Sequence, residues 1–256
     1  MNRLIPIVLF AGACNVVDAP ENLEELVVFG FVQFDDDPSG VATAEGLLPL
    51  TDTLAEELTT GFRVSAITFD ELIEAGVPAE EGNPIVGVSA TVQMDSSVDD
   101  VAVAWSFPRM QEVLEVTLDF RIDAEDGELD CFLSHECDTY AYDGWRQNDI
   151  GFLGESEQVF RREYRWLTLE DDSVILATRD IVPEPAVMSG NVFRLNQQYS
   201  YTLIFPNEDG GSTRMDTFWV DAEVIGIELP DYFALDTAVN NMQNTAEQVD
   251  AFTESQ

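Results

Sequence analysis

The stretch 129–140, "LDCFLSHECDTY", gathers the side chains most able to do chemistry. It holds two of the three cysteines in the chain, Cys131 and Cys137, and the single histidine, His135. Three kinds of site fit these residues: a metal site completed by a neighbouring aspartate, a cysteine nucleophile with a histidine base, or a disulfide loop. The choice depends on whether this stretch lies in a reducing or an oxidising compartment.

The N-terminal stretch "MNRLIPIVLFAGAC" has the order of features found in an export signal. Arg3 supplies a positive charge, residues 4–10 form an apolar run, and small residues precede Cys14. Small residues that end at a cysteine resemble the lipobox of bacterial lipoproteins, in which the cysteine is lipidated. The usual leucine three places before the cysteine is here Ala11, which departs from that pattern. An ordinary buried N-terminal element is the alternative.

The lipoprotein resemblance implies both a location and an order of segments. It implies that residues 1–13 are a signal peptide that is removed, that Cys14 carries lipid, and that residues 14–21 are a tether. Because Asn15 is not aspartate, the analogy favours the outer membrane, on its periplasmic face or at the cell surface. The membrane, reached through the N-terminal lipid, is therefore the first partner that we predict.

An exported location changes the interpretation of the cysteine stretch. Cysteines pair by default in an oxidising compartment, and lipidation of Cys14 leaves two. We therefore predict a disulfide between Cys131 and Cys137, no metal site, and an exposed His135. A loop of this size is worth about 2–3 kcal/mol in the chain-entropy model.

The charge of the chain excludes several classes of partner. It has 256 residues, with 50 acidic residues against 11 basic ones, all arginine, and a formal net charge of −39. Nucleic acids and anionic lipid head groups need clustered cations, so neither is predicted as a partner of the protein surface. The acidic residues are spread along a chain that is 45% hydrophobic, so we predict a folded protein with a repelling surface.

Motifs for catalysis and for cofactors are weak. A serine or cysteine hydrolase would have to use His135, and no GxSxG motif accompanies it. Among 50 acidic residues chance pairs of carboxylates are inevitable, so no particular pair stands out. The stretch "DDDPSGVATAEG" is similar to a calcium loop, but Gly46 stands where the bidentate glutamate belongs, which favours a solvated turn. No glycine-rich phosphate loop is present, and we predict no cofactor.

Apolar periodicity predicts an α+β chain that begins with a small helical segment, 22–83. Three helices are expected in it: one that follows Asn22, a second with a stripe of leucines from Leu47 to Leu58, and a short third one capped by Thr68.

From residue 84 the period becomes that of a strand, with residues 86, 88, 90, 92 and 94 on one face. Two short helices and a strand at 116–122 come next. Two hairpins follow, at 158–181 and 197–224. A long amphipathic helix from Asp231 ends the chain.

This order of elements resembles the START-like, or helix-grip, architecture over residues 84–256. There a curved antiparallel sheet wraps a long C-terminal helix and leaves a cavity, so the resemblance implies a cavity here. The chain also resembles uncharacterised lipoproteins of deltaproteobacteria-like organisms in "CFLSHECD", "YRWLTLED" and "NNMQ". A plain α+β fold without a cavity is the alternative.

Aromatic side chains on the predicted hairpins suit the wall of such a cavity. Arg162, taken as the only cation on that face, would meet a carboxylate or phosphate head, while Arg161 and Arg165 would pair with surface acids. The alternative is a packed core, which needs the same residues. The predicted ligand-binding residues are Phe160, Arg162, Tyr164, Trp166, Tyr199, Tyr201 and Trp219.

These observations together predict a lipid-anchored envelope protein that is not an enzyme and binds a hydrophobic small molecule between sheet and helix. A structural or protein-interaction lipoprotein with a filled core is the alternative. A carboxylate-based hydrolase comes third.

Overall fold

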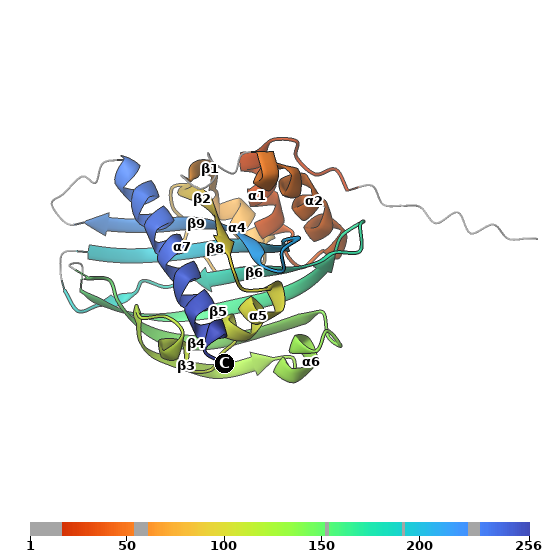
Figure 1. Cartoon of the computed structure of the whole chain (residues 1–256). Coiled ribbons are helices and arrows are strands. Elements are labelled where there is room, and N and C mark those ends of the chain that lie inside the picture. Colours follow the sequence, from red (N-terminus) through yellow and green to blue (C-terminus); the bar gives the residue numbers. More distant parts are fainter. Residues whose placement is uncertain (1–16, 54–60, 152–153, 191–192, 225–230) are drawn as a thin grey trace, which may run out of the picture.

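One antiparallel sheet of nine strands organises the chain (Figure 1). The computed structural model describes residues 17–53, 61–151, 154–190, 193–224 and 231–256. The predicted signal peptide, Cys14 and the leucines at 54 and 58 lie outside these ranges. The strands follow the order β1-β2-β9-β8-β6-β5-β4-β3, with β7 beside β5. The predicted α+β class and its antiparallel sheet are confirmed.

The strands have the following bounds: β1 (Phe62–Ile67), β2 (Ile85–Met94), β3 (Thr117–Asp126), β4 (Thr139–Asp149), β5 (Glu155–Thr168), β6 (Val174–Val182), β7 (Val187–Met188), β8 (Phe193–Pro206) and β9 (Ser212–Val224). The helices are α1 (Leu23–Val32), α2 (Asp37–Thr53), α4 (Phe69–Glu74), α5 (Val98–Trp105), α6 (Leu129–Leu133) and α7 (Asp231–Glu254), with a short 3-10 helix, η1 (Met110–Glu112).

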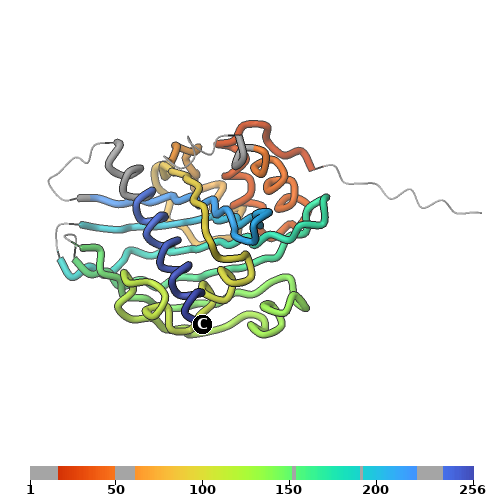
Figure 2. The backbone as a smooth tube through the Cα atoms, in the orientation of Figure 1, coloured from red at the N-terminus to blue at the C-terminus, as the bar shows by residue number. Residues whose placement is uncertain are grey.

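Helices cover both faces of the sheet. Helices α1, α2 and α4 pack on one face, called here the α1 face, where Phe31 of α1 meets Tyr199 and Trp219. Helices α5, α6 and α7 pack on the other, the α7 face, where Val249 of α7 joins the same cluster as Phe160. Figure 1 and Figure 2 show α7 crossing the strands of this face diagonally. Each face therefore has its own apolar core.

Local capping explains where several helices begin. The Asn22 side chain accepts a hydrogen bond from Glu24 N, and Thr68 and Glu71 form a complete capping box at α4. The "DDDPSG" stretch is not the predicted solvated turn. Its Asp36 carboxylate accepts hydrogen bonds from the amide and hydroxyl of Ser39, so the stretch starts α2.

The predicted helical segment 22–83 contains a strand, which corrects that prediction. Strand β1 pairs with β2 and extends the sheet at its edge. Its register shifts between Val64 and Ile67, which breaks the simple alternation of buried residues that marks a strand in sequence.

Strand β2 also departs from the predicted pattern of one buried face. Ala90 and Met94 are buried on the α7 face, but Ser89 and Thr91 are equally buried on the other, beneath the N-terminal helices. Ser89 remains satisfied there because its hydroxyl donates to Asp216 O and accepts from Thr217. A small polar side chain in this strand therefore marks close packing rather than contact with water.

Helix α7 packs on the sheet over its second half. Met242, Ala246, Val249 and Phe252 are buried, as the amphipathic stripe predicts. Side chains of α7 are described from residue 239 onward, so the first part of the predicted stripe lies outside the described side chains. Asp250 fixes the end of the helix because its carboxylate accepts hydrogen bonds from the amide and hydroxyl of Ser96.

A buried arginine fastens the N-terminal helices to the sheet. Arg179 of β6 donates to the carbonyls of Phe31 and Ala75, which end α1 and α4, at 3.2 and 3.4 Å. Its guanidinium also pairs with Glu163, at 2.6 Å, and with Asp35. Carbonyls at helix C-termini lack partners within their helix, so one side chain satisfies two helix ends.

Candidate functional site

The structure divides the seven predicted ligand-binding residues between the two faces. Arg162 of β5 lies opposite Asp180 of β6, which lies opposite Ser200 of β8. Directly opposed residues on neighbouring strands point to the same face of the sheet. Arg162 therefore points to the same face as the even-numbered residues of β8. Tyr199 and Tyr201 are odd-numbered and point to the other face. The prediction that all seven line one pocket is therefore wrong.

The aromatic members of both groups are parts of packed cores. Phe160, Tyr164 and Trp166 are buried on the α7 face, while Tyr199, Tyr201 and Trp219 are buried on the α1 face. Three of these side chains donate hydrogen bonds to backbone carbonyls: Tyr164 to Trp105 O, Trp166 to Phe132 O and Trp219 to Ser65 O.

A group of charged residues, called here the Arg/Asp cluster, occupies the middle of the α7 face. It consists of Arg146, Arg162, Asp180, Arg214 and Asp216. Arg162 donates two hydrogen bonds to Asp180, from Nε and Nη2, each 2.5 Å long. Arg146 donates to Gln158, and its Nη1 lies 3.7 Å from Asp180. The prediction that Arg162 is the only cation on this face is therefore wrong, because Arg146 and Arg214 lie there too.

Arg214 is the least satisfied member of the cluster. Its side chain is 6% exposed, and its guanidinium stacks on Trp105, 4.3 Å from the ring centre. Nη2 lies 2.5 Å from the Asp216 carboxylate, whose other oxygen accepts from Thr202. Nε and Nη1 of Arg214 have no hydrogen-bond partner among the described residues. Buried donors without partners are rare and are expensive to desolvate.

Neighbouring charges shift the pKa values within the cluster. Burial acts to raise the pKa of Asp180, but Arg162, Arg146 and Arg214 outweigh it and hold that pKa below its usual value. Burial lowers the pKa of Arg146, against the attraction of Asp180. The described part of the cluster has three arginines for two aspartates, so it holds an excess of buried positive charge.

The cysteine stretch forms a closed loop against the α7 face. Cys131 and Cys137 are joined in a disulfide, as predicted. His135 is exposed, as predicted, but it also has contacts: its ring stacks on Trp166, with centroids 4.2 Å apart, and its Nε2 lies 2.9 Å from Asp99 of α5. The loop therefore joins α6, α5 and the sheet, and its histidine has a structural contact that spacing alone did not reveal.

The other charged residues of β5 point to the α1 face. Arg161 pairs with Glu163 and Asp143, and Arg165 pairs with Asp37, as predicted for these two arginines. No group of three or more histidine, cysteine, aspartate or glutamate residues able to hold a metal ion occurs within the described ranges.

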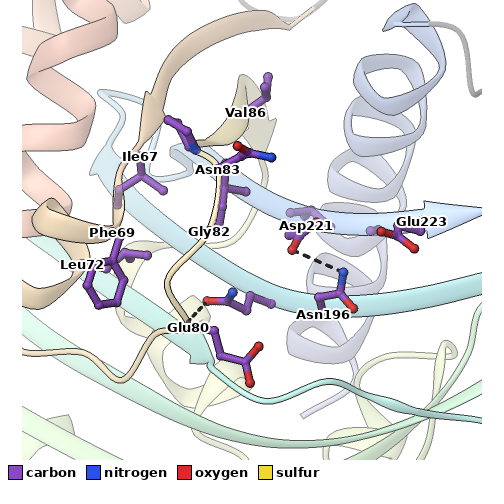
Figure 3. Close-up of a pocket in the computed structure, with 15 residues that line it drawn as sticks. Ile67, Phe69, Leu72, Glu80, Gly82, Asn83, Val86, Asn196, Asp221 and Glu223 are labelled. Atoms are coloured by element: carbon purple, nitrogen blue, oxygen red, sulfur yellow. Dashed lines mark hydrogen bonds between the residues drawn. The ribbon is translucent and has the colours of Figure 1, made fainter.

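A separate pocket of about 410 Å³ opens beside β1 and the ends of β8 and β9 (Figure 3). Ile67, Phe69 and Leu72 form one side, and the strand residues Asn196 and Asp221 lie on the opposite side. The full lining is Ile67, Phe69, Leu72, Glu80, Gly82, Asn83, Pro84, Ile85, Val86, Asn196, Gln197, Val220, Asp221, Ala222 and Glu223.

A β-bulge shapes the polar wall of this pocket. The register of β8 against β9 shifts between Leu195 and Gln197, which leaves Asn196 as the extra residue. Asn196 donates to Asp221, and Gln197 accepts hydrogen bonds from Glu80 N and from the Tyr199 hydroxyl. Gln197 thereby holds the segment after α4 across the pocket.

Sequence patterns did not predict the pocket, and of the three arginines in the Arg/Asp cluster they identified only Arg162. The bulge that gathers Asn196 and Gln197 leaves no mark in the alternation of β8. Arg146 and Arg214 each lie two residues from a buried residue on the same face of their strand. A charged residue at such an inward position is the sequence pattern that could have identified them.

No helix in the described part of the chain is long and apolar enough to cross a membrane. No family model matches the sequence. A search of curated proteins also gives no match.

Several solved structures are similar to this chain. A STAR-related lipid transfer protein from Xanthomonas axonopodis has 12% identity and a TM-score of 0.46, over 68% of this chain and 89% of its own. A START superfamily protein from Mycobacterium smegmatis has 12% identity and a TM-score of 0.41, over 66% and 97%. An aromatase/cyclase from Streptomyces sp. R1128 has 15% identity and a TM-score of 0.41, over 66% and 93%. At these values nothing about ligand or activity follows from the similarity.

Proposed function

We propose that this protein is a lipid-anchored binding protein of the cell envelope, and that it holds an amphiphile with an anionic head on the α7 face. The observation that carries the proposal is the excess of buried arginine in the Arg/Asp cluster. The chain has 11 basic residues in 256, yet three of them point into one interior with two aspartates for partners.

Physical chemistry favours a bound anion at this place. An unpaired charge in a protein interior is costly unless a counter-charge reaches it. Arg214 retains unpaired donors on Nε and Nη1, and Arg146 has one close acceptor, Gln158. A carboxylate matches the planar guanidinium group and would supply both the charge and the acceptors.

The surroundings of the cluster suit the apolar part of such a ligand. Trp105 lies against Arg162 and Arg214, and Phe160 lies 4.8 Å from the Arg146 guanidinium carbon. Both carboxylates of the cluster are buried and ion-paired with arginine, which disfavours a role as nucleophile or base. Binding is therefore favoured over the hydrolase alternative.

Titration calorimetry with octanoate tests the proposed ligand class. We expect octanoate to bind and octanol, which has the same tail, to bind at least about tenfold more weakly, a difference of about 1.4 kcal/mol. Arg146→Gln should weaken octanoate binding by a similar factor. Arg161→Gln is the matched control, because Arg161 is on the same sheet but on the α1 face, and it should leave affinity unchanged. Equal affinities for octanoate and octanol would refute an anion site.

The filled-core alternative rests on a specific observation as well. Phe160, Tyr164 and Trp166, three of the predicted ligand contacts, are packed against neighbouring aromatic side chains. Native mass spectrometry of delipidated protein from its host separates the two roles. A bound small molecule supports the binding role, and its absence together with no octanoate affinity supports a structural or protein-interaction lipoprotein.

The lipid anchor is a separate part of the proposal and has its own test. Radiolabelled palmitate should enter the full chain and should not enter a Cys14→Ser variant. Label that persists in the variant would contradict lipidation at this residue, whatever the outcome of the ligand experiments.

A further inference from the structure

The pocket beside β1 offers both hydrogen-bond acceptors and a donor. Asp221 and Glu223 supply carboxylates, which only accept. Gln197 is 6% exposed, and its Oε1 is already used by Glu80 N and the Tyr199 hydroxyl. The remaining donor, Nε2, makes no hydrogen bond to another described residue and is not sealed from solvent, so it faces the pocket that the side chain lines. This amide can therefore donate to a ligand that accepts.

The combination restricts the chemical class of the ligand. An ammonium group donates to carboxylates but has nothing to offer Gln197 Nε2, and a carboxylate ligand would face two like charges. A hydroxyl group both donates and accepts, so of these three groups it is the one that satisfies the acids and the amide together.

The opposite side of the pocket requires a ligand with an apolar surface. Ile67 and Leu72 are buried members of the α1-face core, and the half-buried Phe69 ring stands beside them. Figure 3 shows these three residues across the pocket from Asn196 and Asp221. A saccharide ring carries hydroxyls around its edge and C–H groups on its faces, which fits one wall of each kind.

We infer that this pocket is a binding site for a neutral saccharide. Its volume of about 410 Å³ falls at the lower end of the range for small-molecule sites, which suits one or two sugar rings. The site is built before ligand arrives: the bulge fixes Gln197, and its Oε1, which accepts from Glu80 N, holds the segment that crosses the pocket. The Tyr199 hydroxyl, which donates to Gln197, lies 3.1 Å from Pro78 O of the same segment. The inference is independent of the amphiphile proposed for the α7 face.

Saturation-transfer difference NMR with common neutral mono- and disaccharides tests the inference on the chain from residue 15 and on the full chain in detergent. We expect signals for at least one saccharide, with a dissociation constant in the millimolar range or tighter. Gln197→Glu is the sharpest variant, because it keeps the Oε1 acceptor that holds the crossing segment and replaces the unpaired donor. It should weaken binding about tenfold or more.

Two further measurements keep the result interpretable. Asp221→Asn should also weaken binding, whereas Glu208→Gln, in the exposed turn between β8 and β9, should not. Circular dichroism of each variant checks that the fold is retained. Putrescine, a diammonium compound, is tested in the same way as a cationic ligand. The inference is overturned if no saccharide binds the wild type, or if putrescine alone gives signals. It is also overturned if both Gln197→Glu and Asp221→Asn leave the saccharide affinity unchanged.

Discussion

Replacement of Arg179 tests how the N-terminal helices are attached to the sheet. The side chain is 3% exposed and serves two helix ends and the Glu163 carboxylate. Arg179→Met keeps much of the apolar stem and removes every one of those bonds. Breaking a buried ion pair by removal of one partner costs about 3–5 kcal/mol. Glu163 retains its bond from Arg161, so we expect a loss within that range, not above it.

Urea unfolding followed by tryptophan fluorescence measures this loss. Arg109→Met is the matched control, because Arg109 is 61% exposed and pairs with Glu112 on the surface, which is worth less than about 1 kcal/mol. Arg179→Lys should give an intermediate loss, since an ammonium group can pair with Glu163 but cannot span both carbonyls. A loss from Arg179→Met no larger than that from Arg109→Met would refute the attachment.

Three other predictions concern close packing, the disulfide and pH. A Cβ on Gly30 would lie 2.6 Å from Thr43 Cγ2 and 2.8 Å from Tyr201 Cε1, so Gly30→Ala should lower the free energy of unfolding by about 1–3 kcal/mol in urea, while Gly190→Ala, with open space around it, should change it little. The double variant Cys131→Ser, Cys137→Ser should lose about 2–3 kcal/mol of unfolding free energy. The unfolded, unreduced wild type should show no free thiol at these two positions, and two reactive thiols there would contradict the bridge. Asp180 has a folded pKa below its unfolded value of about 3.9, so its contribution to stability is complete above that pH and is lost as the pH falls through the folded pKa. The difference in unfolding free energy between wild type and Asp180→Asn should therefore shrink below about pH 4; a constant difference would contradict the lowered pKa.

Local signals in the sequence predicted much of the fold correctly. The cap at Asn22 and the capping box at Thr68 mark helix starts through bonds between near neighbours, and both are present. The two long hairpins were predicted from alternation and turn residues, and they are β5–β6 and β8–β9. The strand β4 was missed because the inward aromatics Tyr140 and Tyr142 stand in an otherwise polar run.

Features set by the register between distant strands could not be read from the sequence. Alternation shows that Tyr164 and Trp166 share a face and that Tyr199 and Tyr201 share a face, but only the pairing of β5 through β6 to β8 shows that these faces are opposite. A bulge in β3 likewise leaves Leu118 exposed, although strict alternation along the strand would put it on the same face as the buried Phe120.

The candidate sites also differ in whether they depend on residues close in sequence or on the pairing of distant strands. The Cys131–Cys137 bridge could be predicted because it joins two residues close in sequence. The Arg/Asp cluster joins β4, β5, β6 and β9, and its excess charge is visible only when these strands are assembled.

The position of β6 has a consequence for how the molecule opens. Every residue from Ile175 to Val182 is buried, although an antiparallel strand is commonly buried on one face and wet on the other. Ile175, Ala177 and Ile181 belong to the α1-face core, and Leu176 and Val182 belong to the α7-face core. Neither layer of helices can separate from the sheet without exposing this shared strand. The amides of β6 should therefore exchange with solvent only through global unfolding, which makes the two layers one cooperative unit.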